Sequence, residues 1–92
     1  MMTRTTDNFV KEGSGVVLLP RIAGASTEAR SLVQEAVSKN REHVFIDGRR
    51  MALHSESFAE ALCDELRKNG VKETSFVGGS PEWQSSVAKY LD

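Results

Sequence analysis

Two short, mainly apolar runs, at residues 16–19 and 43–46, and a third, half-apolar run at residues 74–77 divide the chain. The first run is half β-branched and ends at Pro20, and the second is closed by Asp47 and a glycine. Runs without alternation are typical of strands covered on both faces, because a half-exposed strand alternates apolar and polar residues. We therefore expect buried strands at the first two runs and a third, shorter strand at residues 74–77.

Each run is followed by a segment whose apolar residues recur at the three- and four-residue spacing of a helix. The first apolar stripe covers residues 29–37, the second residues 58–66, and the third residues 83–91, after a start at Ser80 and a proline. Polar residues occupy the other positions of these segments, so each helix has one apolar face. The sequence thus predicts three amphipathic helices.

Serine and threonine residues mark where the first two helices begin. Ser26 or Thr27 is in place to cap the first helix. The second helix begins at Ser55 or Ser57. Ser57 and Glu60 have the spacing of a capping box, in which each side chain satisfies a backbone donor of the other.

The order of elements is strand, helix, strand, helix, strand, helix, which is typical of right-handed βαβ units on a mainly parallel sheet. We expect an α/β fold with a small, mainly parallel sheet of about three to five strands. Residues 9–12 are a candidate edge strand, residues 21–25 a connector, and residues 51–53 an extended piece within a loop. Residues 1–8 then form a flexible tail, and residues 9–92 one domain.

Composition and charge restrict the function. The chain has 92 residues, and its 12 Lys and Arg nearly balance its 13 Asp and Glu, whereas nucleic-acid-binding domains usually show a basic excess. The single cysteine, Cys63, excludes an internal disulfide and a multi-cysteine metal site. No apolar run is long enough to cross a membrane, and residues 1–8 lack the apolar stretch of a signal peptide. We therefore expect a cytoplasmic protein that binds neither nucleic acid nor membrane.

Residues 44–66 have a distinctive order: an apolar strand ending in Asp47, a short loop, and the turn Ser-Glu-Ser-Phe-Ala at residues 55–59, which opens a helix. This order resembles STAS-type domains, the fold of bacterial anti-sigma-factor antagonists. It is most similar to the STAS-like variant whose turn reads Ser-Ser-Ser-Phe-Ala. Residues 76–91 also resemble the last strand and helix of that family. The resemblance implies a STAS-like fold and a regulatory protein that docks a partner around this turn.

Two positions depart from the family pattern. In phosphorylated members, a Ser or Thr of the turn accepts phosphate from a partner kinase, but the corresponding position here is Glu56. His54 stands where the family usually has Asp. These departures argue against a kinase-driven switch and leave the docking surface as the implied function.

The candidate partner-binding surface follows from the turn, the exposed face of its helix and the preceding loop. Its residues are Arg49, Arg50, His54, Ser55, Glu56, Ser57, Glu60 and Asp64. The expected partner is another protein, either a regulatory kinase or sigma-control protein, as the resemblance implies, or the host target of a phage-encoded chain. The competing interpretation is simple helix capping with solvated loop charges. A homodimer through an exposed sheet edge is also compatible with so small a sheet.

A phosphate- or nucleotide-binding sensor is the alternative function. Backbone N–H groups at helix starts favour anions, and the candidate anion-binding residues are Ser55, Ser57, Gly78, Gly79 and Ser80. The glycines lack a Walker lysine and the full dinucleotide-binding spacing, and an ordinary tight connection explains them equally well.

We expect no catalytic residues, no metal and no cofactor. An enzyme would require a reactive Cys63, which lies on the apolar stripe of the second helix and is expected to be a buried hydrophobe. His43 and His54 do not have the spacing of a metal-binding motif. Trp83 and Tyr90 share a face of the last helix and are expected to pack in the core.

Overall fold

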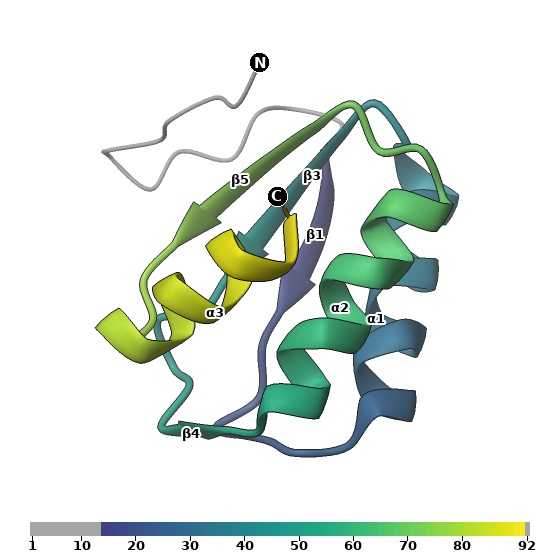
Figure 1. The fold of residues 1–92 in the computed structure, drawn as a ribbon. Helices are drawn as coiled ribbons and strands as arrows, with labels where there is room; N and C mark the ends of the chain where they lie inside the picture. Colours follow the sequence, from purple (N-terminus) through teal and green to yellow (C-terminus); the bar gives the residue numbers. More distant parts are fainter. Residues whose placement is uncertain (1–13, 92) are drawn as a thin grey trace.

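The computed structural model describes residues 14–91 and confirms an α/β fold (Figure 1). The main sheet is parallel and has the strand order β1-β3-β5, with β1 (Gly15–Leu18), β3 (His43–Asp47) and β5 (Glu73–Val77). Three helices alternate with these strands: α1 (Ser26–Lys39), α2 (Glu56–Lys68) and α3 (Pro81–Leu91). The predicted tail at residues 1–8 and edge strand at residues 9–12 lie outside the described residues.

A second, two-stranded parallel sheet lies beyond the carboxyl end of the main sheet. It consists of β2 (Ile22–Ala23) and β4 (Leu53–His54). The Arg21 carbonyl accepts hydrogen bonds from the backbone N–H groups of Ala52 and Leu53, at 2.7 and 3.0 Å. The segment predicted as a connector at residues 21–25 therefore contains a short strand, and the extended piece expected at residues 51–53 is found as β4 at Leu53–His54.

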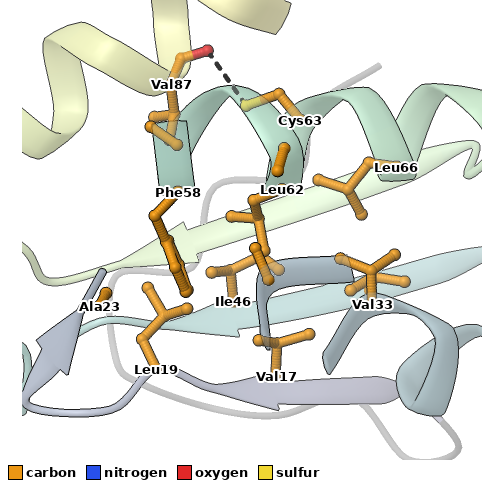
Figure 2. Packing of buried hydrophobic residues seen from close by; sticks show 14 of the residues in the cluster. Val17, Leu19, Ala23, Val33, Ile46, Phe58, Leu62, Cys63, Leu66 and Val87 are labelled. Atoms are coloured by element: carbon orange, nitrogen blue, oxygen red, sulfur yellow. Dashed lines mark hydrogen bonds between the residues drawn. The ribbon is translucent and has the colours of Figure 1, made fainter. Parts of the chain in front are cut away.

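The three helices cover one face of the main sheet. Successive right-handed crossovers along the order β1-β3-β5 bring α1 and α2 to the same face, and α3 packs against α2. Val17 and Ile46 are register partners and pack in one apolar cluster with Phe58 and Leu62 (Figure 2). Trp83 belongs to the same cluster. The expected core positions of Trp83 and of Cys63, each at most 1% exposed, are confirmed.

The prediction that the first strand is covered on both faces was wrong. In β1, Gly15 and Val17 are buried, whereas Val16 is 40% and Leu18 57% exposed. The physical reason is that β1 is an edge strand of the described sheet and the helices lie on the other face. The central strand β3 is buried throughout residues 43–46, as its uninterrupted pattern predicts.

The start of α2 differs by two residues from the capping-box prediction. Ser55 is the N-cap, and its Oγ accepts a hydrogen bond from the Phe58 N–H at 3.1 Å. Ser57 already lies within the helix, so the proposed pairing of Ser57 with Glu60 was wrong. Ser55 and Ser57 fit the sequence pattern equally well. Ser55 differs in its hydrogen bonds to the end of β2, which join segments far apart in the sequence and so leave no local signal.

The other two helix starts give one correction and one confirmation. The N-cap of α1 is Ala25, which has no side-chain acceptor, so capping by Ser26 or Thr27 was wrong. At α3, the Ser80 Oγ accepts a hydrogen bond from the Trp83 N–H at 3.1 Å, which confirms the predicted start.

Gly15 allows α1 to approach β1 closely. A Cβ atom at Gly15 would lie 2.3 Å from the Ala36 carbonyl oxygen, which is helix backbone and cannot move alone. We expect Gly15→Ala to lower the free energy of unfolding by about 2 kcal/mol or more, because the overpacked contact must be relieved by a backbone shift. Urea denaturation measures this change.

Gly24→Ala is the matched control, because a Cβ there has nothing within 4 Å. Its free energy of unfolding should stay within about 0.5 kcal/mol of wild type. Equal destabilisation by the two substitutions would contradict this account of the α1–β1 packing.

Candidate functional site

Ser55 fastens the start of α2 to the end of β2. Its backbone N–H donates to the Ala23 carbonyl at 3.0 Å, and its Oγ donates to the Gly24 carbonyl at 3.0 Å while also capping the helix. Ser57 Oγ lies 3.1 Å from Ser55 Oγ. Because Gly24 leads directly into α1, these bonds also place the first turns of α1 and α2 side by side.

An exposed pair of apolar side chains lies beside this turn. Ile22 and Leu53 are register partners across β2 and β4 and are 68% and 64% exposed. On the other side of the same strands, Ala23 is buried, and the His54 ring meets Trp83 edge-on with ring centroids 5.3 Å apart. His54 is therefore held from within, and the Ile22–Leu53 pair points outward.

Ile22 and Leu53 were not among the site residues predicted from the sequence. Each is a single large apolar residue in a connecting segment, and this was the only available signal. A lone apolar residue in a connector is as compatible with a core contact as with an exposed position. The short pairing of β2 with β4 is what places both side chains at the surface. This pairing joins residues about 30 positions apart, so no local pattern predicts it.

The outer surface of α2 is a trough between α1 and α3, with a volume of about 440 Å³. The buried Ala61 forms its floor. We call this feature the α2 trough, and its lining residues are Ser26, Arg30, Ser57, Glu60, Ala61, Asp64, Arg67 and Tyr90. Three of the predicted partner-binding residues thus share one concave surface.

The charges of the α2 trough are unequally satisfied. Arg30 donates to both Asp64 and Glu65 at 2.9 Å, and Arg67 lies 3.8 Å from Asp64. The hydrogen bond from Arg30 is the main reason that the pKa of Asp64 lies below its ordinary value. Glu60 is exposed and makes no hydrogen bond or ion pair within the described part of the chain. It is therefore the anion of the trough that is available to a partner.

Glu56 joins α2 to α3. Its carboxylate accepts hydrogen bonds from Ser86 Oγ at 2.6 Å and Tyr90 OH at 3.0 Å, and Lys89 Nζ lies 3.5 Å away. The bond from Ser86, followed by that from Tyr90, lowers the pKa of Glu56. Glu56 remains part of the predicted surface, but its oxygens already have partners.

The two predicted arginines differ in the same way. Arg49 binds Asp47 through Nε at 3.0 Å and Nη2 at 2.8 Å, which lowers the pKa of that carboxyl. Arg50 is exposed and forms no hydrogen bond or ion pair among residues 14–91. At the carboxyl end of β3, Arg50 is thus the cation that can meet a partner.

The glycine connection before α3 is filled by side chains. Gly78 and Gly79 have φ values of 75° and 94°, which favour glycine. A Cβ at Gly78 would lie 2.6 Å from Arg49 Cγ, and one at Gly79 would lie 2.4 Å from Trp83 Cδ1. Ser80 caps α3. The space on the Cβ side of both glycines is therefore occupied by Arg49 and Trp83.

A serine–histidine–serine chain that was not predicted from the sequence lies at the opposite end of the sheet. The buried His43 ring is hydrogen-bonded to Ser14 Oγ at 2.7 Å through Nδ1 and to Ser75 Oγ at 2.9 Å through Nε2. These contacts link the starts of β1 and β3 to the middle of β5 and hold the imidazole within the sheet.

Within residues 14–91, no three His, Cys, Asp or Glu side chains are grouped to hold a metal ion. No helix in this described part is long and apolar enough to span a bilayer. No protein-family model matches the chain, and comparisons with curated proteins and with solved structures find no match either.

The Cys63 thiol is expected to be unreactive toward disulfide reagents in the folded protein. Its side chain is fully buried, its Sγ lies 3.8 Å from the Val87 carbonyl, and burial raises the pKa of the thiol to about 11 (Figure 2). At about pH 8, a disulfide reagent should modify it only after unfolding in urea. Rapid modification of the native protein would contradict this expectation.

The charge of Glu56 should stabilise the fold in a pH-dependent way. Because its pKa is lowered in the folded state, the contribution is present above the ordinary value of 4.5 and is lost as pH falls through the folded pKa. Glu56→Gln should therefore be less stable than wild type at neutral pH, and this difference should shrink in acid. Urea denaturation at several pH values measures it.

Glu60→Gln is the control, because it neutralises a carboxylate one turn away that has no described partner. A pH-dependent loss of stability as large as that of Glu56→Gln would show that general charge effects, and not the contacts to α3, explain the result.

Proposed function

We propose that this chain is a small, non-enzymatic docking module that binds another protein at the carboxyl end of its sheet. The docking surface consists of the Ile22–Leu53 pair, the turn at Ser55, and the α2 trough. The resemblance of residues 44–66 to STAS-type domains supports the same function and points to a regulatory kinase or a sigma-control protein as the partner. The host target of a phage-encoded chain is the alternative partner, which the resemblance does not imply.

The observation that best supports this function is the exposure of the Ile22–Leu53 pair. Large apolar side chains that stand together in water mark interaction sites, because their burial against a partner is favourable. Of the described residues, the exposed large hydrophobics are confined to β1, β2 and β4, whereas the outer faces of the helices are polar. The apolar surface also adjoins the turn that the resemblance implicates.

The surroundings of the pair suit recognition. Ser55 fixes the turn through three hydrogen bonds, and His54 is held by Trp83, so little conformational freedom is lost when a partner binds. Arg50 and Glu60 supply available charges of opposite sign in the segments before and after the turn. Such charges orient a partner more than they add affinity.

The phosphate- or nucleotide-sensor alternative depends on groups that have other roles here. Ser55 donates and accepts within the protein, and the glycines before Ser80 pack against Arg49 and Trp83. We therefore favour protein docking over anion binding.

Site-specific photo-crosslinking in cells of the source organism tests the docking surface. A photoreactive residue in place of Leu53 should yield a discrete adduct with one protein, because position 53 lies within the interface. The same residue in place of Lys72, which is exposed before β5 at the far end of the sheet, should not yield this adduct.

A second substitution, Ile22→Asp, should abolish the adduct while the stability stays within about 0.5 kcal/mol of wild type, since Ile22 is exposed. Equal adducts from positions 53 and 72, or an adduct that Ile22→Asp leaves unchanged, would reject the proposed surface.

A further inference from the structure

The α2 trough has the shape of a receptor for one long side chain. Its floor is the small, buried Ala61, and its walls are formed by α1 on one side and by Tyr90 of α3 on the other. The described side chains leave a volume of about 440 Å³ open in the trough, and the residues that line it are mainly polar. A side chain with an aliphatic stem and a charged head suits such a trough.

The charge balance of the trough selects the sign of that head. Arg30 binds Asp64 and Glu65 at 2.9 Å. Arg67 lies 3.8 Å from Asp64 and donates a hydrogen bond to the Tyr90 carbonyl, so both arginines already have partners within the protein. Glu60 is left without a described partner. The positive end of the α2 dipole does not offset Glu60, because Glu56 occupies the first turn. The net unpaired charge facing the trough is negative.

Tyr90 adds a second feature that favours a cation. Its hydroxyl is bound to Glu56, and its ring already has the Lys89 Nζ at 5.1 Å from the ring centroid. The hydrogen bond to Glu56 is the main reason that the pKa of the Tyr90 phenol is raised, and the negative charge of Glu60 adds a smaller contribution. An aromatic ring beside a carboxylate binds guanidinium and ammonium groups.

The trough and the Ile22–Leu53 pair form neighbouring parts of one surface. Ser26 and Ser57, which line the trough, lie in the first turns of α1 and α2. Figure 1 shows β4 at the same end of the molecule as the starts of these two helices. One short segment of a partner can therefore reach both features.

We infer that the partner presents a basic, apolar segment: an arginine or lysine side chain lies in the α2 trough against Glu60 and Tyr90, and an apolar side chain covers the Ile22–Leu53 pair. This inference rests on the proposed docking function. It specifies the chemistry of the partner, which the resemblance and the sequence leave open.

Selection from a displayed library of random peptides on the immobilised full-length chain tests the inference. The selected peptides should combine arginine or lysine with large apolar residues. For a synthetic peptide from this selection, Glu60→Lys should weaken binding by roughly tenfold or more, because attraction becomes repulsion. Leu53→Asp should abolish binding, and fluorescence anisotropy measures both.

Glu82→Lys is the matched control, since Glu82 is exposed on α3 and does not line the trough. It makes the same change of net charge and should alter binding by less than roughly twofold in physiological salt.

Two outcomes would overturn the inference alone: acidic selected peptides, or equal effects of Glu60→Lys and Glu82→Lys while Leu53→Asp still abolishes binding. The docking surface would then stand with a different partner chemistry. If no selected peptide is weakened by Leu53→Asp, both the inference and the docking function at this surface are rejected.

Discussion

The hydrogen bonds of Ser55 are the constraint on which the candidate site depends. One side chain caps α2 and reaches the Gly24 carbonyl, while its backbone N–H binds the Ala23 carbonyl. Two segments about 30 residues apart in sequence are thereby held together where both helices begin. This junction sets the positions of the Ile22–Leu53 pair and of His54. It also sets the position of the first turn of α2, which lines one end of the α2 trough.

The charged side chains at the surface differ in whether they already have a partner within the protein. Arg49 binds Asp47, and Glu56 accepts a hydrogen bond from α3. Asp64 pairs with Arg30 of α1, so all of these charges stabilise the fold. Arg50 and Glu60 have no such partners in the described chain. Within residues 14–91, no buried side-chain nitrogen or oxygen atom lacks a hydrogen-bond partner. The groups that remain available to another molecule therefore lie at the surface, and they include the exposed apolar pair.

Periodicity was enough to predict the three helices, the alternation of strands and helices along the chain and the core position of Cys63, because each depends on residues close in sequence. The exposure of β1 was not predictable, since it depends on which strand lies at the sheet edge. The pairing of Ile22 with Leu53 links two-residue strands, too short for any periodic signal. The attachment of Glu56 to α3 depends on Ser86, 30 residues downstream. Local patterns do not encode such contacts.

The most direct measurement of the central claim is a nuclear magnetic resonance titration of the labelled chain with the partner identified by cross-linking. The account predicts that the backbone amides perturbed most strongly cluster at the carboxyl end of the sheet, at Ile22, Leu53, Ser57 and Glu60. The apolar groove between β5 and α3, lined by Phe76, Val87 and Leu91, should be little affected. Strong perturbation of that groove, with unchanged signals around Ser55, would contradict the account.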